Sequence, residues 1–309
     1  MADEWNARIE RIHEGYNDVP LTHCDFSGTA WLMSLAYGCE LIKIDGRINA
    51  EPLFRDIDEL DGFAPPQRIW EYGVYPVIFE RLAEFHRRWP HTEFGNSDNQ
   101  SPNDVATCIL HSEAAMMAMF EAPEKLHRLL DMVTTSMLEL HRHFEATVPN
   151  LACMCPEYWI PYGIHFSDDN AAFLSPATYE EFARPYVERL GEVYGGVHYH
   201  CCMGYAQSLD VMAATKGFMC FDPQVDYNPM DKAIDLCEQY GAIWLFNNDP
   251  WQKHPERTAS DIDTFRRGLD AAADRIGVAA CIWGNTRDEA VALAEQVRDL
   301  AASLDILAE

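Results

Sequence analysis

The sequence predicts an α/β fold built from repeated strand–helix units. Strand-like and helix-like segments alternate regularly from residue 197 onward, which is typical of parallel βα units. The chain has 309 residues, and eight such units need about 250. No glycine-rich phosphate loop of the Rossmann or Walker kind occurs, which favours a closed barrel over a doubly wound sheet. The expected architecture is therefore a single-domain (β/α)8 TIM barrel.

The first part of the chain alternates less regularly. We expect an N-terminal amphipathic helix within residues 1–17 and a barrel over 18–305, because no change in composition marks a linker. Residues 38–66 read as irregular. The other elements expected in this part are a strand at 19–26, helices at 28–37, 74–88, 102–119, 123–146 and 175–194, and a mixed strand and loop at 151–166. Pro123 and Ser175 mark two of the helix starts as first helical residue and N-cap.

The second part contains four consecutive strand–helix units. The expected strands are 197–202, 217–222, 241–247 and 277–283, and the helices that follow them are 206–216, 230–239, 259–275 and 286–304. Each strand is a short run rich in apolar and aromatic residues, and each helix repeats its apolar residues every three to four positions.

The composition excludes several classes of function. Asp and Glu number 50 against 23 Lys and Arg, a formal charge of −27, which repels nucleic acid and anionic membrane surfaces. No apolar run approaches the roughly 18 residues of a membrane span, and the N-terminus lacks the apolar stretch of a secretory signal. We expect a cytoplasmic protein, and therefore no disulfide framework among its ten cysteines.

A candidate metal site follows from His200, Cys202 and Cys281. These residues lie near the ends of two predicted strands, and the carboxyl ends of barrel strands carry the active site. One imidazole and two thiolates are a typical zinc set, and three protein ligands leave a position open for catalysis. Alternation along a strand puts residues 200 and 202 on one face, with Cys201 on the other. From these three residues alone, packing in the core stays open as the alternative to a metal site.

Several short motifs occur in a characteristic order. They are Ser167–Pro176 (SDDNAAFLSP), Tyr179, Phe182, Pro185-Tyr186, His200-x-Cys202, Phe246–Pro250 (FNNDP), and Cys281 with Thr286, preceded by Ser101-Pro102 and Pro123–His127. In this order they resemble the uroporphyrinogen decarboxylase superfamily, which includes the cobalamin:thiol methyltransferases. The resemblance covers about residues 18–305 and is strongest over 165–290.

The methyltransferase branch implies zinc held by His200, Cys202 and Cys281, and alkyl transfer to or from a thiol. A corrinoid, free or on a partner protein, would be the methyl donor, and the other partner is a small-molecule substrate. The chain departs from the family pattern at Met203 and Phe246, where glycines are usual. The arginine-rich N-terminal signature that binds porphyrin carboxylates is also missing, so uroporphyrinogen is not the expected substrate.

Further candidates lie at predicted strand ends and in loops. Asp168 and Asp25 are the candidate catalytic residues, and a purely structural role is the alternative for each. The candidate substrate contacts are His23, Asp98, His198, Asn247 and Asp249. The alternative is packing for His23 and His198, and a solvent-exposed loop for Asp98. For Asn247 and Asp249 it is a turn before Pro250.

Two other functions remain open. One is a metal-free decarboxylase or lyase of the same fold, in which Asp25 or Asp98 stabilises a protonated intermediate and Cys202 only packs. The other is a non-catalytic protein that binds and delivers a corrinoid or tetrapyrrole. Zinc content distinguishes the transferase from both.

Overall fold

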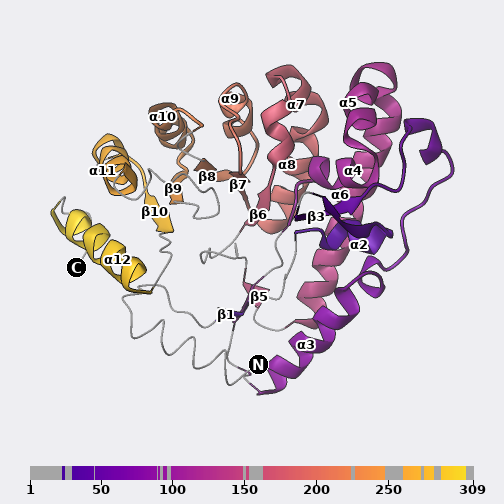
Figure 1. Ribbon diagram of the computed structural model, residues 1–309, viewed down its shortest axis with the longest axis horizontal. Helices are drawn as coiled ribbons and strands as arrows, with labels where there is room; N and C mark the ends of the chain where they lie inside the picture. Colours follow the sequence, from indigo (N-terminus) through magenta and orange to yellow (C-terminus); the bar gives the residue numbers. More distant parts are fainter. Residues whose placement is uncertain are drawn as a thin grey trace. The chain divides into compact units, whose positions relative to one another are not determined.

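The computed structural model describes residues 23–24, 30–44, 46–88, 90, 93–95, 99–148, 151–152, 163–223, 227–247, 260–272, 275–281 and 287–303. The chain divides into two compact units, a larger one of His23–Met219 and a smaller one of Met1–Thr22 with Cys220–Glu309 (Figure 1). The expected N-terminal helix within 1–17 lies outside the described residues. Among the helices that are described, none has the length and apolar character needed to cross a membrane.

The larger unit contains two sets of parallel strands. β1 (His23–Cys24), β4 (Glu93–Gly95) and β5 (Leu151–Ala152) form one sheet in the order β1-β4-β5. β6 (Ile164–Ser167) pairs with β7 (Val197–Cys201), with His165 opposite His198 and Ser167 opposite His200. Parallel pairing of strands separated by helices is what the βα repeat predicts.

An antiparallel hairpin replaces part of the segment that we expected to be irregular. β2 (Glu40–Ile44) pairs with β3 (Arg47–Glu51), and Ile44 lies opposite Arg47, so the connection has two residues, Asp45 and Gly46. Gly46 has a φ of 85°, a left-handed conformation that glycine adopts without steric cost. Asp-Gly between two strands is a strong hairpin signal.

Helices make up most of the remainder of the larger unit. They are α2 (Leu32–Tyr37), α3 (Tyr75–Arg88), α4 (Pro102–Ile109), α5 (Ser112–Glu121), α6 (Pro123–Thr147), α7 (Pro176–Phe182), α8 (Arg184–Tyr194) and α9 (Leu209–Ala213), with short 3-10 turns η1 (Ile57–Leu60), η2 (Ile69–Glu71) and η3 (Asp169–Phe173).

Two helices that we expected to be continuous are divided. The break between α4 and α5 falls at Leu110 and His111, where Phe54 bonds across the chain: its N–H donates to the Ile109 carbonyl and its carbonyl accepts from the His111 N–H. The break between α7 and α8 falls at Ala183, just before Pro185, which has no N–H to continue the helical bonding.

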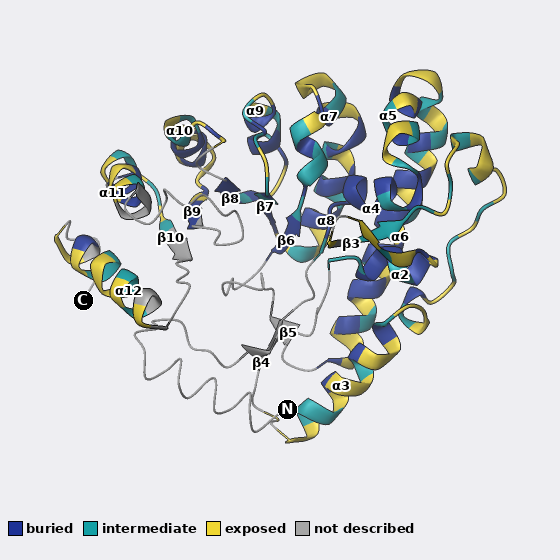
Figure 2. Cartoon of the chain, viewed as in Figure 1, coloured by how far each residue is buried: buried dark blue, intermediate teal, exposed yellow. Residues whose placement is uncertain are grey.

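The core of the larger unit lies along α6 and the β6–β7 pair. Figure 2 shows one side of α6 and both strands as buried. The buried residues of α6 include Leu126, Leu129, Leu130, Val133, Met137, Leu140 and Phe144, spaced at helical periodicity. Full burial of such side chains stabilises the fold by about 1.5–3 kcal/mol each.

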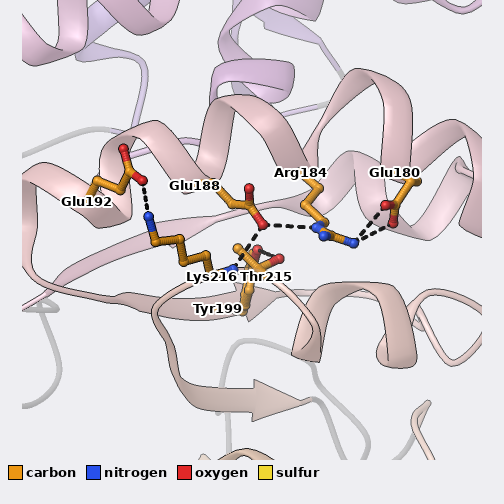
Figure 3. Close-up of polar contacts among 7 residues, drawn as sticks. All are labelled: Glu180, Arg184, Glu188, Glu192, Tyr199, Thr215 and Lys216. Carbon is orange, nitrogen blue, oxygen red and sulfur yellow. Dashed lines mark hydrogen bonds and ion pairs between the residues drawn. The ribbon is translucent and has the colours of Figure 1, made fainter.

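A chain of ion pairs and hydrogen bonds runs from Glu180 of α7 along one side of α8 (Figure 3). Arg184 binds Glu180 one turn before it and Glu188 one turn after it. Glu188 also accepts the backbone N–H of Lys216 at 3.0 Å, and the Lys216 ammonium pairs with Glu192. Beneath them the buried Tyr199 hydroxyl of β7 donates to Thr215 at 2.8 Å. These contacts tie residues 215–216 to α8 and to the strand that carries His200.

The smaller unit continues the strand–helix alternation. Its elements are β8 (Phe218–Pro223), which spans the boundary, α10 (Met230–Tyr240), β9 (Ile243–Asn247), α11 (Ser260–Ala272), β10 (Val278–Cys281) and α12 (Arg287–Ser303). β9 pairs in parallel with both β8 and β10. All of these lie within a few residues of their predicted positions.

Candidate functional site

The loop after β6 is fixed to the start of α4 by a buried carboxylate. The two oxygens of Asp104 accept the backbone N–H groups of Asp169 at 2.8 Å and Asn170 at 2.9 Å. The Asn170 side chain in turn donates to Thr107 at 2.8 Å. Asp104 is 3% exposed, and burial, followed by the neighbouring Asp168 and Asp169 carboxyls, raises its pKa well above the usual value. The loop therefore has a defined position relative to α4.

Asp168 is completely buried between three elements. Its side chain accepts hydrogen bonds from the Ser101 hydroxyl at 2.9 Å and the Tyr179 hydroxyl at 2.6 Å. Its backbone N–H donates to the His200 carbonyl at 2.8 Å. Burial raises its pKa to about 6, although both hydroxyl hydrogen bonds act in the opposite direction. In this geometry Asp168 positions the end of β7; the catalytic role expected for it stays a prediction.

His200 and Cys202 come together at the end of β7. The His200 Nε2 lies 3.1 Å from the Cys202 Sγ, and both side chains are half-buried. The Cys202 backbone N–H donates to the Asp169 carboxylate at 2.8 Å. Cys201 is fully buried, and its sulfur lies 3.9 Å from the Asp169 carbonyl oxygen. The predicted assignment of residues 200 and 202 to one side and 201 to the other agrees with these contacts.

Two more histidines lie beside this pair. His165 and His198 face each other in the β6–β7 register, and the rings of His165 and His200 are 5.9 Å apart. Burial, then the nearby His200 and His198, lowers the pKa of His165 well below its usual value. A Cβ on Gly163 would lie 2.8 Å from the His198 Nε2, so His198 packs where only glycine fits. This contact gives His198 a packing role; its expected substrate contact stays a prediction.

The third expected zinc ligand is described only in its backbone. Cys281 is the last residue of β10 and lies opposite Asn247 of β9. The side chains of Cys281, Asn247 and His23 are outside the described part of the structure, as are Asp25, Asp98 and Asp249 entirely. Among the residues described, no three histidine, cysteine or acidic side chains form a group that could hold a metal ion.

Sequence reasoning missed the residues that fix the loop. Ser101 caps α4 by accepting the Asp104 N–H at 3.0 Å, and its hydroxyl also reaches Asp168. The Ser-Pro-x-Asp sequence at 101–104 is a helix-start signal, so it predicts the cap but not the contact with Asp168. Tyr179 was part of the motif, but without an assigned role.

A cavity of about 440 Å³ lies between the β2–β3 hairpin, α4 and the loop after β6. Its volume lies in the range of small-molecule sites. Its lining comprises Trp31, Ile42, Ile44, Asn49, Ala50, Glu51, Pro52, Arg55, Gln100, Asp104, Thr107, Cys108, His111, Ser112, Asp169 and Asn170. Asp169 belongs both to this lining and to the anchor of Cys202, so the cavity and the His200–Cys202 pair share a residue.

Comparison with solved structures finds the same fold in a methyltransferase from Methanosarcina mazei. The two match with a TM-score of 0.66 at 18% sequence identity, over 92% of this chain and 80% of the other. A proposed vitamin-B12-independent methionine synthase from Listeria monocytogenes matches with a TM-score of 0.48 at 10% identity, over 98% of this chain and 87% of the other. No curated protein sequence matches the chain significantly.

The sequence itself matches the family model of uroporphyrinogen decarboxylase (URO-D) over residues 32–240. This span contains the hairpin, α4, the Asp168–Asn170 loop and the His200–Cys202 pair. It covers more than half of the 309 residues. The chain therefore belongs to the uroporphyrinogen decarboxylase family.

Proposed function

We propose that this chain is a zinc-dependent methyl- or alkyltransferase on a closed (β/α)8 barrel, which moves a methyl group between a corrinoid or other methyl donor and a thiol. The 3.1 Å approach of the His200 Nε2 to the Cys202 Sγ at a strand end carries the proposal. An imidazole and a thiol are both zinc ligands, and carboxyl ends of parallel strands are where barrel enzymes place their chemistry.

The two described side chains fit a zinc ion. Tetrahedral zinc, bonded to nitrogen and sulfur at about 2.0–2.3 Å, separates these atoms by about 3.6 Å. The separation in the chain is 3.1 Å, so the pair needs to open by only about half an ångström. Cys281, at the end of β10, is the proposed third ligand.

Zinc held by these residues would lower the pKa of a thiol bound to it and so supply a thiolate near neutral pH. In the transfer the acceptor sulfur forms a bond to the methyl carbon while the bond from that carbon to its donor breaks, and the thiol proton leaves to solvent. The protein's own part is to hold the ligands rigidly. Asp169 fixes the Cys202 backbone, and Asp168 fixes the His200 carbonyl through its own N–H.

The family match favours a second candidate, a metal-free decarboxylase or lyase. In that case Cys202 only packs against His200, and an acidic residue such as Asp25 or Asp98 stabilises a protonated intermediate. The small-molecule substrate then loses CO₂ and no methyl group moves.

Zinc content and transfer activity of the purified protein test the proposal. We expect about one zinc per chain and methylation of a thiol by methylcobalamin, both lost in Cys202→Ser. Cys201→Ser is the matched control, because this neighbouring sulfur is buried and faces Asp169, and it should retain both. A zinc-free protein that releases CO₂ from a substrate would support the decarboxylase instead. Corrinoid binding without turnover would point to a carrier.

A further inference from the structure

The lining of the cavity combines apolar and polar side chains. Ile42 and Ile44 of β2 lie two residues apart and therefore on the same face of the strand, while Lys43 between them lies on the opposite face. With Trp31, Ala50 and Pro52 they are the apolar residues of the lining. The polar residues come from Gln100, α4 and the loop after β6, and also from the hairpin side, where Asn49, Glu51 and Arg55 lie.

The charges of the lining are unbalanced. It contains three carboxyl groups, those of Glu51, Asp104 and Asp169, and one guanidinium, that of Arg55. Arg55 is already bound to Glu51 at 2.5 Å. Over the described residues no lysine or arginine pairs with Asp104 or Asp169, and no hydrogen bond reaches the second carboxylate oxygen of Asp169. Because Glu51 is paired with Arg55 and both oxygens of Asp104 accept backbone N–H groups, the carboxylate left for a ligand is that of Asp169.

We propose that this cavity binds an organic ammonium compound with a small apolar part, as the substrate of the transferase proposed above. The substrate role rests on the proposed function, but binding itself does not. The ammonium group donates to the Asp169 carboxylate, and the apolar part lies against Ile42, Ile44 and Trp31, whose ring also attracts cations. A carboxylate or sulfonate of the same size would meet the Asp169 carboxylate instead and be repelled.

The position of Asp169 relates this ligand to the reacting pair. The carboxylate that would bind the ammonium also accepts the Cys202 N–H at 2.8 Å. A ligand bound to the other oxygen of Asp169 is therefore separated from the Cys202 backbone by a single side chain, that of Asp169. This placement makes the cavity a substrate site next to the proposed zinc ligands.

Three probes that share a phenyl ring and one further carbon test the charge preference: benzylamine as the ammonium ion, benzyl alcohol and benzoate. Binding is measured by calorimetry on the full chain near neutral pH and at about 0.15 M salt, which screens the overall negative charge. We expect the ammonium to bind at least about tenfold more tightly than the other two. Equal or tighter binding of benzoate or benzyl alcohol would overturn the proposal.

Three variants locate the site. Asp169→Asn keeps an oxygen for the Cys202 N–H but removes the charge, and should weaken ammonium binding about tenfold. Ala50→Trp fills the cavity, leaves every carboxyl in place and should also abolish binding. Glu80→Gln removes an exposed carboxyl on α3, outside the cavity, and should change nothing. Unchanged affinity in both of the first two variants would show that the cation binds elsewhere.

These measurements use neither zinc nor turnover. If the protein binds zinc and methylates a thiol but does not prefer benzylamine over the other two probes, the ammonium site is refuted and the transferase is not. Tight ammonium binding in a protein without zinc would refute the proposed transferase alone.

Discussion

The Nε2 of His200 lies 3.1 Å from the sulfur of Cys202, and the backbone of Cys202 is held by the Asp169 carboxylate. The geometry of this pair depends on a loop whose own position is set by Asp104. The proposed ligands are thus coupled to α4 through hydrogen bonds that two neighbouring carboxylates accept.

Changes at Asp169 should separate zinc binding from ligand binding. Asp169→Ala removes the acceptor of the Cys202 N–H, and we expect zinc affinity to fall about 10- to 100-fold, as is typical when a partner of a metal ligand is lost. Asp169→Asn retains an acceptor oxygen and should bind zinc nearly as well as the wild type. Competition with a zinc chelator measures both affinities. Equal losses in the two variants would show that charge, and not the hydrogen bond, is what matters.

Tyr179→Phe should destabilise the larger unit. The variant removes the hydroxyl that donates to Asp168 at 2.6 Å and leaves a fully buried carboxyl with one donor fewer. We expect a loss of about 2 kcal/mol in the free energy of unfolding, measured by denaturant titration. Tyr72→Phe, on an exposed tyrosine, is the control and should change stability by no more than a few tenths of a kcal/mol.

Gly163→Ala should cost more than the same change at Gly46. Both glycines have left-handed φ angles, 95° and 85°, so both variants incur the backbone penalty of about 1 kcal/mol. Only at Gly163 does the new Cβ also meet the His198 ring, at 2.8 Å, whereas nothing lies within 4 Å at Gly46. The extra loss should be about 1–3 kcal/mol in unfolding experiments. Similar losses at the two sites would mean that His198 moves aside freely.

His143 should make stability depend on pH below neutrality. Its ring stacks on Trp70 at 4.3 Å, and burial, then the charge of Arg68, lowers its pKa. The folded protein therefore takes up the proton less readily than the unfolded chain, so this contribution to stability is present above the unfolded pKa and is lost as pH falls through the folded one. His143→Phe keeps a flat ring that does not titrate. Between pH 7.5 and 5.5 the wild type should lose more free energy of unfolding than this variant; parallel curves would contradict the expectation.

The local pattern of the sequence predicted much of the fold. The strand expected at 197–202 is β7, Val197–Cys201, and the helix expected at 230–239 is α10, Met230–Tyr240. Both have strong periodicity, and glycine or proline residues mark where they begin or end. The pairing of His200 with Cys202 followed from the same alternation along one strand.

What the sequence could not predict depends on contacts between distant parts of the chain. Asp104 accepts a hydrogen bond from the backbone of Asp169, 65 residues away, and the periodicity of apolar residues within one segment cannot predict such a contact. The division of the 102–119 helix likewise depends on Phe54, which bonds to residues 109 and 111. The hairpin is different, because Asp45-Gly46 is by itself a strong local signal for a turn between two strands, within the segment 38–66 that we expected to be irregular.

That hairpin closes on itself with a two-residue turn, so its ladder of backbone hydrogen bonds is self-contained. Its length and side chains can be changed without altering the strand end at which the imidazole and the thiol lie. If both proposals hold, the hairpin contacts the apolar part of the ligand, whereas Asp169 and the proposed metal ligands lie on other segments. Exchanging the hairpin alone should then change the ligand preference and leave those residues as they are.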